Sequence, residues 1–564
     1  MSRWTLLFRT LLFHWRTNLA VGLGVVAGTA VIGGALIVGD SVRGSLRDMT
    51  LARLGAIDYS LTGPRFFRER LAMEFNAYPS HAGIPMSWAI LLQGSAEKRV
   101  PAGEKVLTRA GRINVIGIEP NGQQLIGNAK AIPDGNHVVL SDRVARDLQV
   151  KEGDEITLLV ELPSDIPRDA LLGKRDGTAV EIPLTVRAVL ADYEPGSRFG
   201  LKPDQQLPAN VFVSLKTLQD RLGLAGHEPS PRDPRSIPAR VNTLFVLDFQ
   251  IDGTPTIGPE GAQRLDQDLA LLWKLEDFHA RIVSNEKFGY LSLESERMIL
   301  DRPVAEAARK VAERLGCRVS PVLAYIANEI SVVGRPADVG KSEKNPAYSR
   351  YAVVVGLDPA VFAADAGPPF GPFRFQTPEI PPRLGDGKVE QPDSVGEIIL
   401  NAWLAKDLRA KVGDVVRLAY HVVGSHGELP EEERQFKVRG IVALDGTVAA
   451  DRGLIPEVHG ITDVKSFDEW DAPFPMKTVT ARDDEYWTEY RATPKAFVTL
   501  KMAQHLWQSR YGDLTSLRMA PVPGKTLHES RELLSAALLK ELQPAEMGLS
   551  FQPVKYQGLQ ASSG

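Results

Sequence analysis

The chain has 564 residues, of which 43% are apolar, 24% charged and 7% aromatic, and this profile excludes a largely disordered or fibrous protein. At roughly 150 residues per domain, the length also exceeds a single small domain. The 66 Lys and Arg residues nearly balance the 70 Asp and Glu residues, for a net charge of −4, so no basic face points to a nucleic-acid partner.

Residues 1–18 predict a short amphipathic helix at the cytoplasmic membrane interface, because MSRWTLLFRTLLFHWR places its apolar and aromatic residues near one helical face. Leu19 to Gly39 then form 21 residues without a charge. At about 1.5 Å per residue, a helix of this length matches the hydrocarbon thickness of a bilayer, roughly 30 Å, which predicts a transmembrane helix over residues 19–39. A cleaved signal peptide is the alternative, but its apolar region should span only about 7 to 15 residues.

Flanking charges predict the orientation of this helix. Arg3, Arg9 and Arg16 precede it, whereas the charges that follow it directly cancel. By the positive-inside rule the N-terminus lies in the cytoplasm and the bulk of the chain outside it.

Small residues inside the predicted transmembrane helix indicate helix partners. Ala20, Gly24 and Gly28 recur at four-residue spacing, as do Ala35 and Gly39. Such spacing lets helix backbones approach closely within a membrane, so we expect other transmembrane helices to pack here. The alternative is that Gly and Ala are simply frequent in such helices.

An internal repeat organises the rest of the chain. VVLSDRVARDLQVKEGD, from Val138, and IILNAWLAKDLRAKVGD, from Ile398, agree without a gap at a fixed offset of 260 residues. VIGIEP from Val115 likewise matches VVGLDP from Val354. Two copies of one unit, over 57–248 and 287–520, are predicted. Residues 521–564 add a C-terminal helix and strand.

Each copy predicts a β-α-β start followed by a β-rich part. The expected helices run from Arg65 to Phe75 and from Val304 to Leu315. A Gly-Asp pair, which suits a tight turn, recurs at Gly153 and Gly413. The fold class is therefore α+β, with one N-terminal transmembrane helix and a large extracytoplasmic mixed α/β body built from two copies of the unit.

Two segments rich in proline predict surface insertions. They are GHEPSPRDPRSIP, from Gly226, and GPPFGPFRFQTPEIPP, from Gly367.

No residue pattern predicts a catalytic, cofactor or metal site. Gly334 to Ser342 has five residues between its glycines where a nucleotide-binding loop has four. His421 and His426 lack an HExxH pattern, and the run Asp483-Asp484-Glu485 predicts a solvated acidic turn. The chain is thus expected not to be an enzyme, although carboxylates of a hydrolase that meet only in space stay open.

GALIVGDSVRGSL, from Gly34, resembles the first transmembrane segment of FtsX-like, MacB-type ABC transporter permeases. The two repeated segments resemble an element of that family's periplasmic core domain. The resemblance implies a permease subunit in the bacterial inner membrane, which works with a separate cytoplasmic ABC ATPase and exports or extracts lipoproteins, peptides or amphiphiles by mechanical coupling.

The chain departs from that family in two ways. Its periplasmic part is doubled, and the later transmembrane helices are missing, so we expect an incomplete or split permease. Its membrane partners would be the lipid bilayer and other transmembrane helices, from its own missing C-terminal part or from a second permease, for example in a homodimer. The alternative is a single-pass, envelope-anchored binding or scaffold protein without transport activity.

Overall fold

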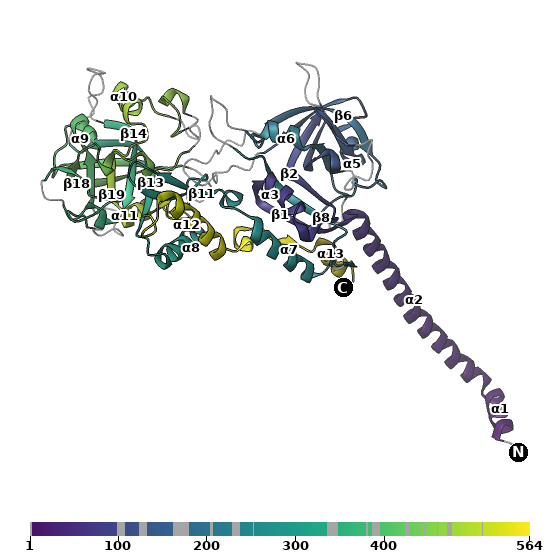
Figure 1. Cartoon of the computed structure of the whole chain (residues 1–564). Coiled ribbons are helices and arrows are strands. Elements are labelled where there is room, and N and C mark those ends of the chain that lie inside the picture. The colour runs from purple at the N-terminus through teal and green to yellow at the C-terminus, as the bar shows by residue number, and fades with distance from the viewer. Residues whose placement is uncertain are drawn as a thin grey trace.

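A long N-terminal helix leads into the first of two sheet units, and the C-terminal helix returns to the base of that long helix (Figure 1). The computed structural model describes residues 3–98, 108–122, 132–161, 180–202, 207–227, 237–251, 253–334, 348–378, 382–385, 395–422, 429–444, 446–458, 461–470, 476–509 and 511–563.

The N-terminal region consists of α1 (Arg3–Phe13) and α2 (Trp15–Leu54), which has 40 residues. At about 1.5 Å per residue α2 is roughly 60 Å long, about twice the hydrocarbon thickness of a bilayer. The helix does not end at Gly39 but continues to Leu54, where Gly55 adopts a φ of 55°. We call residues 40–54 the stalk. It joins the apolar segment to the first sheet without a loop.

The first unit is a nine-stranded sheet in the order β21-β1-β8-β2-β3-β7-β4-β6-β5, in which β2 also pairs with β5. The six strands β2-β3-β7-β4-β6-β5 therefore close into a barrel. Strands β8, β1 and β21 extend it as an open sheet. The strands are β1 (Ile57–Arg68), β2 (Met86–Lys98), β3 (Arg109–Ile118), β4 (His137–Ser141), β5 (Glu155–Val160), β6 (Val180–Leu190), β7 (Asn210–Ser214), β8 (Arg240–Leu247) and β21 (Phe551–Gln552).

The second unit repeats this plan. Strands β13, β14, β19, β16 and β18 follow one another, and β17 pairs with both β18 and β13 to close a second barrel, while β20, β12 and β11 form the open part. The strands are β11 (Ala280–Asn285), β12 (Tyr290–Ser295), β13 (Val319–Val332), β14 (Tyr348–Leu357), β15 (Phe375–Thr377), β16 (Gly396–Asn401), β17 (Val415–His421), β18 (Glu431–Val442), β19 (Ala496–Thr499) and β20 (Ser516–Met519).

The two barrels also share their pattern of parallel and antiparallel pairs. In the first, β3 pairs with β7 and β4 with β6 in parallel, and in the second β14 pairs with β19 and β16 with β18 in parallel. The remaining neighbours within each barrel are antiparallel. Two copies of one fold, as the repeated sequence predicts, are confirmed.

Helices occupy equivalent places in both units. The matched pairs are α3 (Glu69–Asn76) with α8 (Arg302–Arg314), α5 (Asp142–Leu148) with α9 (Ala402–Leu408), and α6 (Leu215–Leu222) with α11 (Leu500–Trp507). Outside these pairs lie α7 (Pro259–Leu272), α10 (Ala481–Tyr490), α12 (Leu527–Glu541) and α13 (Val554–Ser563), and a small hairpin of β9 (Gln250–Ile251) and β10 (Thr254–Pro255).

The repeated Gly-Asp pair forms the same turn in both units. Gly153 has a φ of 90° and Gly413 a φ of 98°, a region that favours glycine. The Asp154 carboxylate accepts a hydrogen bond from the Lys151 backbone nitrogen, and Asp414 does the same for Lys411, each at 3.0 Å. The Gly-Asp pair therefore recurs because both units need the same tight turn.

Two sequence-based expectations about local structure are wrong. Residues 65–68 belong to β1 and not to a helix, because Phe67 pairs with Val241 and α3 begins only at Glu69. The segment from Gly367 is not only a surface insertion, since Phe370 and Phe373 are buried and β15 pairs with β18. Residues 228–236 of the other proline-rich segment lie outside the described part of the chain.

A continuous apolar cluster joins the two units. It contains Phe75 of the first unit and Leu269 of α7 together with Val304 of α8 and Leu534 of α12. Helices α8 and α12 pack on each other beside β20 and β12 of the second unit, whereas α7 packs on α3 and β21 of the first. The two units therefore form one packed body.

Candidate functional site

The small residues of the apolar segment lie on one face of α2. At about 100° per residue, Ala20, Gly24, Gly28, Ala35 and Gly39 all fall within roughly 100° of the helix circumference. A side chain added at Gly24 or Gly28 would meet nothing within 4 Å in the described part of the chain. The most apolar stretch of α2 is likewise 0% buried. This face is open to another helix, and a partner on it stays a prediction.

The three N-terminal arginines are exposed. Arg3 and Arg9 lie on α1, whereas Arg16 lies in the first turn of α2, with its guanidinium 5.6 Å from the ring centre of Trp15. The two helices meet at His14, which is not helical. The orientation that these charges predict is not tested by the fold.

Helix α13 packs on the end of the stalk and runs antiparallel to it. Lys555 Nζ lies 2.5 Å from Asp58 Oδ1, just beyond the end of α2. Three residues later, Gly558 lies against Thr50, so closely that an added Cβ would come within 2.7 Å of Thr50 Cγ2. Leu54 and Val554 are buried together in a small apolar cluster beneath this contact. The C-terminal helix is therefore directed along the stalk toward the apolar segment.

Two ion pairs, the first of them buried, link the first sheet unit to the second unit and to the segment just before it. Arg68, at the end of β1, donates from Nε to Asp277 Oδ1 and from Nη2 to Asp277 Oδ2, each at 2.8 Å. The two side chains are 6% and 0% exposed, so this bidentate pair is shielded from water. A second pair joins Arg240 Nη2 of β8 to Glu296 Oε2 at 2.8 Å. We call these two pairs the clasp.

Glu296 of the clasp also contacts His279, whose Nδ1 lies 3.1 Å from Glu296 Oε2. Burial would raise the pKa of Glu296, but the contacts with His279 and Arg240 outweigh it and lower that pKa. The carboxylate is therefore held charged between the two units, because its charge is compensated from both sides.

Asp483 is not part of a solvated acidic turn, and that sequence-based expectation is wrong. It lies in α10 and is 1% exposed. Its carboxylate accepts hydrogen bonds from Ser349 Oγ at 2.6 Å and from Lys495 Nζ at 2.7 Å. Burial would raise its pKa, but the Lys495 ammonium outweighs burial and lowers it. The acidic run therefore contains one half of a buried ion pair, and its partner Lys495 directly precedes β19.

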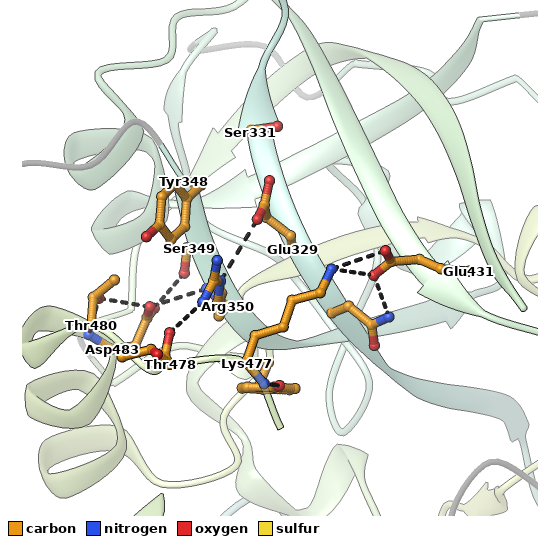
Figure 2. Close-up of polar contacts among 12 residues, drawn as sticks. Glu329, Ser331, Tyr348, Ser349, Arg350, Glu431, Lys477, Thr478, Thr480 and Asp483 are labelled. Atoms are coloured by element: carbon orange, nitrogen blue, oxygen red, sulfur yellow. Dashed lines mark hydrogen bonds and ion pairs between the residues drawn. The ribbon is translucent and has the colours of Figure 1, made fainter. Parts of the chain in front are cut away.

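Figure 2 shows how the chain from Lys477 to Asp483 is fastened to the second barrel. Lys477 Nζ donates to both oxygens of Glu431 on β18, at 2.8 and 2.9 Å. The Arg350 backbone nitrogen donates to Asp483 Oδ2 at 3.0 Å, and Arg350 Nε lies 3.7 Å from Glu329 Oε2. Each of these carboxylates therefore has a cationic or hydrogen-bonding partner, which is the arrangement of a structural network.

The nucleotide-binding loop and the histidine pair considered from the sequence lie only partly on described residues. Residues 335–347, which hold most of the loop from Gly334, lie outside them, as does His426. His421 has Nδ1 at 3.1 Å from the carbonyl oxygen of Leu429. Within the described ranges, no group of three or more His, Cys, Asp or Glu side chains could hold a metal ion.

A carboxyl pair in the first barrel was not expected from the sequence. Glu69, the first residue of α3, accepts hydrogen bonds from Trp88 Nε1 at 3.1 Å and Gln219 Nε2 at 2.7 Å. Glu119 lies beside it just after β3. Burial, and then the charge of Glu69, raise the pKa of Glu119 to about 7.

This pair predicts that thermal stability falls as the pH rises through about 7. A carboxyl group whose folded pKa is raised stabilises the fold below its ordinary pKa and loses that contribution as pH rises through the folded value. Glu119→Gln should flatten the pH dependence and stabilise the protein at about pH 8 by about 1 kcal/mol, a figure reduced because Glu119 is only half-buried. Melting curves at about pH 5.5 and 8 measure this.

The matched control is Asp220→Asn, which removes an exposed carboxylate from α6 of the same unit. It should leave the slope of Tm against pH unchanged. Equal slopes for Glu119→Gln and the unmodified chain would contradict the assignment.

No family model and no curated relative matches the sequence. The solved structures that are similar to part of the chain include two transporter domains. The extracellular domain of the noncanonic ABC-type transporter YknZ from Gram-positive bacteria covers 38% of this chain and 91% of its own, at 11% identity and a TM-score of 0.21. The periplasmic region of MacB from Actinobacillus actinomycetemcomitans covers 39% of this chain and 86% of its own, at 13% identity and a TM-score of 0.23.

Proposed function

We propose that the chain is a permease subunit, or part of one, of an ABC transport system of the MacB/FtsX type. In this proposal α2 anchors the chain in the bacterial inner membrane, with Arg3, Arg9 and Arg16 on the cytoplasmic side. The two sheet units form the periplasmic body. The observation that supports this most directly is that one uninterrupted helix joins the apolar segment to the first sheet unit.

This continuity supports a mechanical role. A loop between membrane segment and body would absorb a displacement, whereas a hydrogen-bonded helix passes it on. The stalk contains no proline, the residue that most often kinks a helix, and its end is packed on α13. A shift of the apolar segment would therefore move the first unit, and the two ion pairs of the clasp would carry the shift toward the second unit.

The proposal implies partners that this chain does not contain. A cytoplasmic ABC ATPase would supply ATP hydrolysis, and further transmembrane helices would complete the pathway, either from the same permease or from a second one in a homodimer. The cargo would be lipoproteins, peptides or other amphiphiles. Neither a cofactor nor a nucleic acid is part of the proposal.

Gly24→Leu combined with Gly28→Leu should abolish association of α2 with other membrane helices, because two branched side chains would hold the backbones apart. Insertion should persist, since leucine favours the bilayer core. The measurement is crosslinking in native membranes, followed by purification of the tagged chain and mass spectrometry of what is attached. We expect an ATPase and a multi-span membrane protein with the unmodified chain and neither with the variant.

Gly22→Leu combined with Gly33→Leu is the matched control. These two glycines lie on the opposite face of α2, so the same increase in side-chain volume should leave association intact. If no ATPase is attached to any of the three chains, the permease proposal fails and the single-pass binding or scaffold protein takes its place.

A further inference from the structure

A cavity of about 870 Å³ lies in the first unit where the stalk meets the barrel. Its size is within the range of pockets that hold small-molecule ligands, about 300 to 1,000 Å³. Its walls come from the last turn of α2, from β2 and β3, and from the segment around residues 199–202. The cavity thus lies at the end of the stalk that leads from the apolar segment to the first unit.

The charge in this cavity is of one sign. Arg53, Arg112, Arg143 and Lys202 line it, and no Asp or Glu among the described residues does. Arg143 is engaged elsewhere, because its Nη1 donates to the carbonyl oxygen of Leu207. The other three cations have no acidic partner among the lining residues, so the cavity attracts anions.

One of these cations, Arg53, has a hydrogen-bond donor without an acceptor among the described residues. Arg53 Nη1 is buried and makes no hydrogen bond within the described part of the chain. Two neighbouring segments hold this side chain in place. Arg53 Cδ packs beside Gly200, and the guanidinium lies beside Gly558 of α13. A buried donor left without an acceptor costs about 1 to 3 kcal/mol, more when it is charged, and an anion that reached Nη1 from the cavity would remove that cost.

The rest of the wall is mixed, with Thr62, Gln93, Asn114 and Asn242 beside apolar side chains. Leu91 and Ile116 face the cavity from the barrel, and Phe199 and Leu201 from the neighbouring segment. An inorganic anion would leave this surface unused, whereas an alkyl chain attached to the anion would cover it.

We propose that this cavity binds an anionic amphiphile, with its phosphate or carboxylate group at Arg53 and Lys202 and its alkyl chain against the half-buried Leu91, Leu92 and Leu201. The inference names a substrate class for the proposed permease and rests on that function for the source of the ligand. Binding itself needs no partner protein, so it is measured separately from transport.

The test uses the full chain in nanodiscs of zwitterionic phosphatidylcholine, with radiolabelled dodecyl phosphate as the probe and empty nanodiscs as background. Dodecyl phosphate should bind saturably above that background. Unlabelled dodecanol and inorganic phosphate should each compete at least tenfold more weakly, because each offers only half of the interaction. Equal competition by inorganic phosphate, or by dodecanol, would overturn the amphiphile assignment.

Two variants locate the site. Arg53→Gln should weaken binding about tenfold, as expected for the loss of one charge-assisted hydrogen bond, and Lys202→Glu at least about tenfold, because it also places a negative charge beside the anion. Lys202 is exposed, so its reversal tests the site even if Arg53→Gln disturbs the packing of α13. Arg47→Gln, an exposed stalk arginine outside the cavity, is the control and should bind normally. Unchanged affinity in both test variants would overturn the proposal, whether or not an ATPase partner is found.

Discussion

Lys495→Met is expected to lower the free energy of unfolding by about 3 to 5 kcal/mol, because it leaves the Asp483 carboxylate buried without its counter-ion. Lys495 and Asp483 have side chains 3% and 1% exposed. The ammonium also lies 4.6 Å from the ring centre of Tyr486 and 4.8 Å from that of Trp403. Urea unfolding followed by tryptophan fluorescence measures the loss.

Lys477→Met is the matched control. Lys477 pairs with Glu431 in the same network, but the two side chains are 46% and 32% exposed. Water can solvate Glu431 after the change, so the expected cost is at most about 1 kcal/mol. Similar losses for both variants would contradict the distinction between a buried and an exposed pair.

The pair of Asp483 with Lys495 also predicts how acidification changes the stability of the fold. The pKa of Asp483 is lowered in the folded protein, so its stabilisation is present above the ordinary aspartate pKa and lost as pH falls through the lowered value. Acidification should therefore destabilise the unmodified chain more than Lys495→Met. The difference between the two unfolding free energies should shrink at low pH.

Asp277→Asn is expected to cost about 3 kcal/mol and to divide one unfolding transition into two. Arg68 would keep a buried charge, with Glu74, 3.7 Å away, and Glu276 as its remaining acidic neighbours in the described part of the chain. The clasp is also where the first unit meets the segment that leads into the second. Calorimetry should show two separated transitions where the unmodified chain shows one.

Arg314→Met is the control for this experiment. It breaks an exposed pair with Glu541, whose side chains are 57% and 28% exposed, and it lies within the second unit and the C-terminal segment. One transition with a small shift is expected. A single transition in Asp277→Asn would mean that the shared apolar cluster alone holds the units together.

Local patterns account for what could be predicted. The repeat was visible because Gly153 and Gly413 need a positive φ and the following aspartates fasten the turn, so both copies keep these residues. The apolar segment within α2 was visible because a bilayer demands a long uncharged run. These constraints act within a few residues of one another.

Long-range pairings account for what could not be predicted. Arg68 and Asp277 are 209 residues apart, and nothing near either residue announces the other. Asp483 resembles any acidic surface run until Lys495 is known to be buried beside it. The stalk was missed for another reason: the charges after Gly39 end the apolar run, but no proline follows that would end the helix.

Strand β21 couples the completion of the first sheet to the synthesis of the C-terminal part of the chain. Phe551 pairs with Leu61 on β1, and its ring stacks on Phe75 with centroids 5.1 Å apart. The β1 edge of the first sheet therefore stays unpaired until residue 552 has been made, although every other described strand of that sheet precedes residue 248. An uncovered edge is a template for mispairing. During biogenesis the first unit is thus the first of the two to be made, yet its sheet is completed only after the second unit has been synthesised.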